Sequence, residues 1–304
     1  MTIFDRLFPD FTEILPEVNR CRDYHIYDGR GRRYLDMYLS GGTALLGHRP
    51  NGISLRVKNV MAKGLWANYP TAWPGRLKKE LNSLLPAYPE VLLFSGLIEA
   101  ERWLNDRFPG KEVLDPAVSD SDTDHPALWR PFCPSEYSNT KEGGEGLALV
   151  PILPFPGPFT PGMVCLPEGS IRPEEKKLYS GASIPPYILA GVVRAAALVR
   201  SHYEDLSSDR TGAKPDGHKP GSTGKKGSAG DKAPCDRKLT LPQWEKRGPY
   251  LKYTGSTDAY RTCFKAALAR QILLPPAPEL PLVIPGLYSR GEIGPLIEIF
   301  SSID

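Results

Sequence analysis

Several stretches of the chain place apolar residues three or four positions apart, the spacing of one face of an α-helix. The stretch 53–63 carries such a stripe, and 74–85 carries another that begins with Pro74, a residue favoured in the first helical turn. The stretch 185–203 combines a proline start, a run of alanines and an apolar stripe, so it predicts a long helix. We expect further helices at 97–108, at 260–271 and from Gly291 onward.

Shorter apolar runs predict β-strands. Residues 91–94 form a continuous apolar run that Ser95 and Gly96 stop, which is typical of a buried strand. The runs 147–155 and 162–166 are bounded by prolines, and the run 272–274 leads into two more. We expect a strand in each of these runs.

Residues 24–39 predict a β-hairpin. Apolar positions lie on either side of Asp28-Gly29-Arg30-Gly31, where glycine supplies the positive φ that a tight turn needs. The return strand is expected to continue to Leu39, because Ser40-Gly41-Gly42 follows it directly. The hairpin therefore leads into a loop made flexible by glycine.

The composition divides the chain into four regions: 1–88, 89–204, 205–238 and 239–304. The third consists of Ser, Asp, Gly, Lys and Pro with almost no apolar side chain. Such a segment cannot bury enough surface to offset the entropy of ordering it, so we expect a disordered linker. The other regions hold the apolar runs, and the hydrophobic content of the whole chain is 40%.

Charge and cysteine content exclude several classes of protein. A net charge of +3 is too small to predict a nucleic-acid partner. The five cysteines are scattered and never form a Cys-x-x-Cys pair, which gives neither a zinc site nor a disulfide framework. No window approaches the roughly 20 apolar residues of a membrane helix, and no signal peptide is visible. We expect a cytoplasmic protein without a metal site.

The hairpin and the loop after it resemble the opening of the class III aminotransferases. These are pyridoxal-phosphate (PLP) enzymes that include glutamate-1-semialdehyde aminomutase. Residues 260–276 and 289–293 resemble two C-terminal segments of the same family. The N-terminal resemblance is carried by Asp28, Gly29, Gly31, Arg33, Tyr34, Leu35, Asp36, Gly41, Gly42, Gly47, His48 and Pro50.

The resemblance implies a set of cofactor-binding residues. It places Gly42 and His48 beside the active site. Residues 93–101 resemble a family segment in which a strand ends on Ser-Gly and a helix begins, so Ser95 and Gly96 would hold the cofactor phosphate. The alternatives are a loop histidine that satisfies backbone groups at His48, and a plain strand–turn–helix at Ser95 and Gly96.

The resemblance also implies a fold, the PLP-dependent transferase fold type I, in a reduced form. Residues 1–88 and 239–304 would build a small α+β domain from both termini, and 89–204 would build a large domain whose sheet has lost strands. The family carries an aspartate at the end of an apolar strand, for the pyridine nitrogen. It also carries a lysine in a Gly-Lys turn, which forms the internal aldimine. The lysines between the Ser95-Gly96 turn and the alanine-rich helix are Lys111, Lys141, Lys176 and Lys177, and none follows an expected strand. Gly224-Lys225 lies after that helix, inside the 205–238 linker, so a solvated linker is the simpler interpretation and a displaced aldimine turn the alternative. We therefore expect no catalytic residues.

Three interpretations of function stay open. The first is a degenerate, non-catalytic relative that binds a phosphate-bearing ligand or serves as a partner subunit. The second is an active PLP enzyme whose lysine is unconventional or comes from another subunit. The third is an interaction module that works through the basic 205–238 linker. A shortened sheet leaves edges and apolar surface to cover, so we expect a homo-oligomer or a heteromer with an aminotransferase-like homologue.

One aromatic group has no assignment from the resemblance. Trp66, Tyr69 and Trp73 lie close together between two expected helices. Core packing is the simpler expectation for such a group, and a pocket lining or a dimer seam is the alternative.

Overall fold

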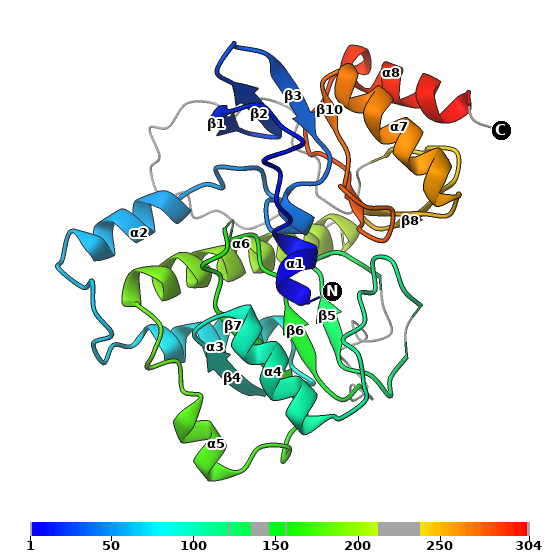
Figure 1. The fold of residues 1–304 in the computed structure, drawn as a ribbon. Helices are drawn as coiled ribbons and strands as arrows, with labels where there is room; N and C mark the ends of the chain where they lie inside the picture. The colour runs from blue at the N-terminus through cyan, green and yellow to red at the C-terminus, as the bar shows by residue number, and fades with distance from the viewer. Residues whose placement is uncertain (1, 121, 135–145, 156, 212–237, 303–304) are drawn as a thin grey trace.

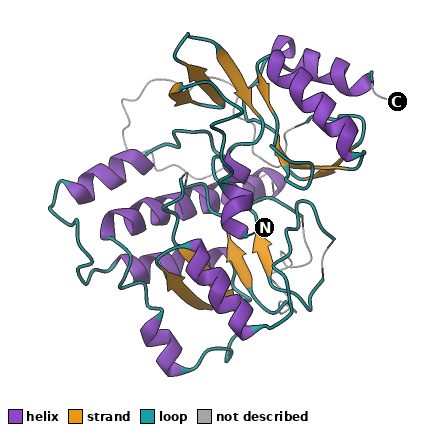
Figure 2. Cartoon of the chain, in the orientation of Figure 1, coloured by secondary structure: helices purple, strands orange, loops and turns teal. Residues whose placement is uncertain are grey.

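The computed structural model describes residues 2–120, 122–134, 146–155, 157–211 and 238–302. They form a mixed α/β fold with three sheets (Figure 1 and Figure 2). A larger unit holds one sheet between helices, and a smaller unit, uppermost in Figure 1, combines the hairpin with the C-terminal helices. The long helix α6 crosses the middle of the molecule.

The first sheet combines both ends of the chain. Its strand order is β1-β2-β3-β10, in which the first three strands are antiparallel neighbours and β10 pairs in parallel with β3. The expected turn is present, because the Asp28 carboxylate accepts from the backbone N–H of Arg30 and Arg32 at 2.9 and 2.8 Å. The strands are β1 (Val18–Arg22), β2 (His25–Asp28), β3 (Arg33–Asp36) and β10 (Ile272–Leu273).

A second, smaller sheet packs with the C-terminal helices. Its order is β11-β9-β8, all antiparallel. Aromatic side chains from the sheet and both helices share its core, and Trp244 lies 5.5 Å from Phe300 between ring centroids. The elements are β8 (Trp244–Arg247), β9 (Tyr250–Tyr253), α7 (Thr257–Ala269), β11 (Leu282–Val283) and α8 (Arg290–Ser301).

The third sheet forms the centre of the larger unit. Its order is β4-β7-β6-β5, with β4 and β7 antiparallel, β7 and β6 antiparallel, and β6 and β5 parallel. Side chains of β4 alternate between two separate cores, as the period of a strand requires. The strands are β4 (Glu90–Phe94), β5 (Ala127–Trp129), β6 (Leu149–Pro151) and β7 (Gly162–Leu166).

Helices cover both faces of this third sheet. Val91 and Leu93 face the core that includes residues of α3 and α6, whereas Leu92 and Phe94 face the core that includes residues of α1 and α4. The helices are α1 (Ile3–Leu7), α2 (Ile53–Met61), α3 (Trp73–Leu84), α4 (Leu97–Arg107) and α6 (Pro186–Thr211). Two short helices, η1 (Ser40–Gly42) and α5 (Pro173–Leu178), complete the described elements.

The expected helices and most expected strands are confirmed, with three differences in extent. The return strand of the hairpin ends at Asp36, because the Asp36 carboxylate binds the N–H of Tyr38 and Leu39 and turns the chain. The strand expected over 147–155 ends at Pro151, because the chain turns soon afterwards, where the Phe155 N–H donates to the Leu153 carbonyl at 2.7 Å. Helix α6 continues to Thr211, beyond the expected boundary at 204.

The rest of the expected linker, 212–237, lies outside the described residues, so its disorder stays a prediction.

The expectation that Trp66, Tyr69 and Trp73 pack in the core is wrong for two of them. Trp66 and Tyr69 are 59% and 56% exposed, whereas Trp73 is partly buried and packs against the core. Both outer strands of the third sheet are partly paired within the chain. Leu93 of β4 donates its N–H to the Tyr179 carbonyl at 2.9 Å, and Leu128 of β5 donates to the Leu114 carbonyl at 2.7 Å. The association expected from open edges and apolar surface stays a prediction.

Candidate functional site

The loop after β3 is organised by a buried carboxylate. Asp36 accepts from two backbone N–H groups, and its Oδ2 lies 2.9 Å from Nε2 of His48. The backbone N–H of His48 donates to the Asp23 carbonyl at 2.7 Å. The backbone and the ring of His48 therefore both hold this loop in place, and the predicted role of His48 in cofactor binding stays a prediction.

Where this loop meets the third sheet, the structure contains a buried ion pair. Arg130 directly follows β5, and its Nε and Nη2 donate to the two carboxylate oxygens of Asp115, each at 2.6 Å. The two side chains are 1% and 2% exposed. Nη1 of Arg130 donates to the carbonyl of Gly41 in η1. The Arg130 guanidinium thus connects three parts of the chain: the end of β5, the residues around Asp115 and the loop after β3.

The smaller unit adds the aromatic ring of Tyr250 to Arg130, Asp115 and Gly41. These four residues together form the Arg130 cluster. The Arg130 guanidinium carbon lies 5.5 Å from the ring centroid of Tyr250 in β9, and the Tyr250 hydroxyl donates to the Pro131 carbonyl at 3.2 Å. Gly42 has a φ of +96°, and a Cβ there would lie 3.0 Å from Nη1 of Arg130. Gly42 is therefore required for the close packing of the loop against Arg130.

Burial and pairing act in opposite directions on the charges of this cluster. Burial raises the pKa of the Asp115 carboxyl, but the Arg130 guanidinium and its hydrogen bonds outweigh burial and hold that pKa below its usual range. Burial raises the pKa of the Tyr250 hydroxyl well above 10 and that of the Cys133 thiol to about 12. The cluster therefore presents neither a thiolate nor an unpaired carboxylate at neutral pH.

The Ser95-Gly96 turn has the strand–turn–helix form that the sequence predicts. It follows β4 and precedes α4, but its donors are engaged within the chain. The N–H and the hydroxyl of Ser95 both donate to Oε2 of Glu99, at 3.0 and 2.5 Å. A Cβ on Gly162 would lie 2.4 Å from the Gly96 carbonyl oxygen, so β7 packs directly on the turn. A phosphate at this helix terminus would have to displace the Glu99 carboxylate.

The predicted site residues fall into two groups with different neighbours. Gly42 packs against Arg130, and His48 binds Asp36. Ser95 binds Glu99 of α4, and Gly96 packs against Gly162 of β7. The sequence analysis identified neither Arg130 nor Asp115 as a site residue. The available signal was a charged residue directly after an apolar run, at Ala127-Leu128-Trp129-Arg130.

The described residues do not fit PLP. The residues that follow the strands of the third sheet are Ser95, Arg130, Ile152 and Pro167, so within the described chain no lysine stands directly after one of these strands. Asp115 has both oxygens bound by Arg130, and Glu99 holds the donors of Ser95. A Schiff-base lysine, an anion for the ring nitrogen and a phosphate site are thus each missing from these positions.

Solved structures with the same arrangement of elements are aminotransferases. Ornithine aminotransferase from Plasmodium yoelii matches with a TM-score of 0.60 over 94% of this chain and 92% of its own, at 12% identity. An omega-transaminase from Sphaerobacter thermophilus matches with a TM-score of 0.57 over 99% of this chain and 97% of its own, at 13% identity. The chain has the class III aminotransferase fold. The fold expected from the N-terminal resemblance is therefore confirmed.

Relatives in sequence add a link to one activity over a short segment. An uncharacterized protein of Treponema pallidum is 26% identical over 295 residues, which cover 91% of each chain. Glutamate-1-semialdehyde 2,1-aminomutase from Limosilactobacillus reuteri is 30% identical over 83 residues, 27% of this chain and 19% of the aminomutase. No family model matches the chain. The structural matches thus cover 94% and 99% of this chain, whereas the sequence similarity to the aminomutase covers 27% of it.

The described residues contain no helix that is long and apolar enough to span a membrane.

Proposed function

We propose that this protein is a non-catalytic aminotransferase-like subunit that assembles with a second copy of itself. The first half of the proposal, that the protein is non-catalytic, rests on the ion pair between Arg130 and Asp115. A protonated pyridine nitrogen needs a carboxylate beside it, and the carboxylate buried next to β5 is already neutralised by a buried guanidinium. A second cation at this position would meet Arg130 in a medium of low dielectric, where repulsion is strong.

The absence of catalysis predicts a specific labelling result. After incubation with PLP and reduction with borohydride, we expect the label to spread over several exposed lysines, because no lysine of the described chain directly follows a strand of the third sheet. The measurement is peptide mass mapping of the reduced protein. The same protein unfolded in urea provides the control, since all its lysines are then equally accessible.

One labelling result contradicts the proposal. If the folded protein carries a visible absorption band that reduction transfers to one lysine, and the unfolded control does not, the protein is a PLP enzyme. That lysine would then be its catalytic residue, in agreement with the second interpretation from the sequence.

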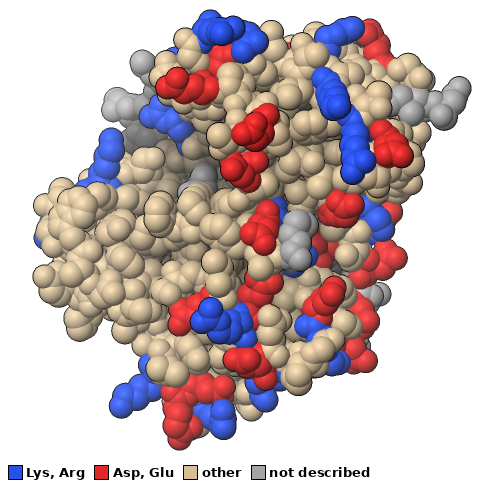
Figure 3. Space-filling model, in the orientation of Figure 1, with Lys and Arg blue, Asp and Glu red and all other residues tan. Residues whose placement is uncertain are grey.

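The second half of the proposal rests on an exposed apolar surface. Leu55 of α2, Trp66 and Tyr69 are each more than half exposed, and the Trp66 ring lies 6.2 Å from that of Tyr187 at the start of α6. The part of the molecule that includes α2 lies on the left in Figure 1 and Figure 3. Figure 3 shows few charged side chains on the visible face of this part, whereas the rest of the visible surface carries many. A face with few charges fits a second copy of itself without desolvating ions, as a two-fold interface requires.

A charge placed on this surface should therefore disrupt the dimer. We expect Trp66→Glu to raise the dimer Kd by about 100-fold, because large aromatic anchors carry much of the energy of an interface. The measurement is sedimentation velocity over a range of protein concentrations. Leu178→Glu is a matched control, because Leu178 is also an exposed apolar residue, 71% exposed, but lies on α5. A wild-type protein that is monomeric throughout, or an equal effect of both variants, contradicts the proposal.

A further inference from the structure

A cavity of about 430 Å³ lies where the two units of the molecule meet. Arg6 of α1 and Ser119 of the segment after α4 form its wall on the larger unit. Lys252 of β9, Thr257 of α7 and Glu279 form its wall on the smaller unit. None of these residues belongs to the Ser95-Gly96 turn. Arg6 connects the cavity to the buried ion pair, because its charge contributes to the lowered pKa of Asp115.

Two basic side chains line this cavity. Arg6 is partly buried. Its Nη2 donates to the Val113 carbonyl at 3.2 Å, but its Nε is buried without a hydrogen-bond partner among the described residues. The Nζ of Lys252 lies 4.0 Å from an oxygen of Asp120, whose side chain is 88% exposed, so this ion pair is weak. Arg6 and Lys252 therefore both bring positive charge to the wall of the cavity.

The N-terminus of α7 adds further donors. Thr257 is the first residue of this helix and lines the cavity, and the Ser256 hydroxyl caps the helix by accepting from the Ala259 N–H at 3.3 Å. The N–H groups of a first helical turn have no intrahelical acceptor, and the helix dipole favours an anion at this end. Hydroxyls of Ser119 and Thr257 provide additional hydrogen-bonding groups in the wall.

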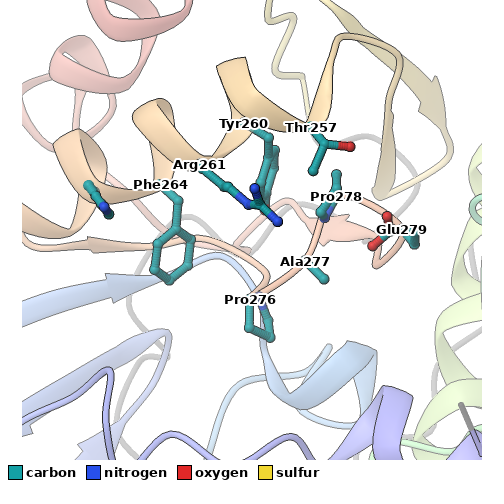
Figure 4. Close-up of a pocket in the computed structure, with 9 residues that line it drawn as sticks. Thr257, Tyr260, Arg261, Phe264, Pro276, Ala277, Pro278 and Glu279 are labelled. Carbon is teal, nitrogen blue, oxygen red and sulfur yellow. The ribbon is translucent and has the colours of Figure 1, made fainter.

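A second cavity, of about 300 Å³, continues from the first along α7. The two share Thr257, Pro278 and Glu279. In Figure 4 the side chains of Arg261 and Phe264 extend from α7 on the side of the loop that carries Pro276 and Ala277. This second cavity has an aromatic wall and a proline wall, which suit the organic part of a ligand.

We propose that the first cavity binds the phosphate group of a small phosphomonoester and that the second holds its organic part. Two cations, two hydroxyls and a helix N-terminus provide the donors that a tetrahedral dianion requires. Glu279 stands at the junction and opposes the anion, so it limits affinity. This proposal goes beyond the proposed function and does not depend on the oligomeric state.

Isothermal titration calorimetry at constant ionic strength tests the proposal, with phenyl phosphate and inorganic phosphate as probes. We expect phenyl phosphate to bind more tightly than inorganic phosphate, because its ring can lie along Phe264. Lys252→Met should weaken binding of both probes about tenfold, through loss of a charge-assisted hydrogen bond. Glu279→Gln should tighten binding about two- to fivefold by removing a like charge.

Lys246→Met is the matched control, because Lys246 is exposed on the neighbouring strand β8 and does not line the cavity. Its Kd for both probes should equal that of the wild type. The proposal is overturned if neither probe binds, if Lys252→Met and Lys246→Met have equal effects, or if Glu279→Gln weakens binding. The last result would point instead to a ligand with an ammonium group.

Discussion

Replacing Asp115 with alanine should lower the free energy of unfolding by about 3–5 kcal/mol, the largest loss that we expect from a single side chain here. The substitution leaves the Arg130 guanidinium buried, 1% exposed, without the carboxylate that accepts from its Nε and Nη2. Urea-induced unfolding, monitored by tryptophan fluorescence, measures the loss. Asp106→Ala is a suitable control, because Asp106 is exposed on α4 and should change stability by less than about 0.5 kcal/mol.

A double variant separates the uncompensated charge from other causes of instability. Asp115→Ala combined with Arg130→Met removes both charges, so we expect it to be more stable than Asp115→Ala alone. If the double variant is less stable than Asp115→Ala, the loss comes from packing around Asp115 and not from the buried charge.

The same pair should make stability depend on pH. Because Arg130 holds the pKa of Asp115 below its unfolded value of about 3.9, the stabilisation is complete above that pH. It is lost as the pH falls through the folded pKa. The wild type should therefore lose more stability between about pH 5 and pH 3 than Asp115→Ala does.

Gly248→Ala should lower the free energy of unfolding by about 3 kcal/mol. Gly248 forms the turn between β8 and β9 with a φ of +66°, and a Cβ there would lie 2.1 Å from the carbonyl oxygen of Phe132. The cost combines an unfavourable backbone conformation with a clash against backbone, which no side-chain rotation relieves. The same urea unfolding experiment measures it.

Gly64→Ala isolates the conformational part of this cost. Gly64 has a similar φ of +74°, but a Cβ there would meet no atom within 4 Å. We expect it to lower the free energy of unfolding by about 1–2 kcal/mol only. Equal losses in Gly64→Ala and Gly248→Ala would mean that the β8–β9 turn can move away from Phe132 at no cost.

The local elements of the fold were predictable because each depends on residues within a few positions. The stripe of α3 includes Leu77 and Leu81, which lie one helical turn apart, and both are fully buried. The turn at Asp28 likewise depends only on its own carboxylate and on a nearby glycine. The short strand β5 was missed, since its three residues are too few to show a period.

The candidate site was predictable only in part. The Ser95-Gly96 turn has its expected place between a strand and a helix, because the apolar run of β4 and the start of α4 define it locally. The engagement of Ser95 by Glu99 could have been considered, since the two residues are four positions apart. The position of Trp66 on the surface could not, because an aromatic side chain suits a core and an interface equally well.

The sequence by itself determined the longer helices, the hairpin and the strands β4, β6, β7 and β10. Through the segments at its two ends it also determined the resemblance to class III aminotransferases. Only the tertiary structure decided that Arg130 binds Asp115 and the Gly41 carbonyl, and that Arg6 and Lys252 line one cavity. Arg130 and Gly41 are 89 positions apart. Hydrophobic periodicity reports which face of an element is buried, but the partner of a buried charge is set by how distant elements pack.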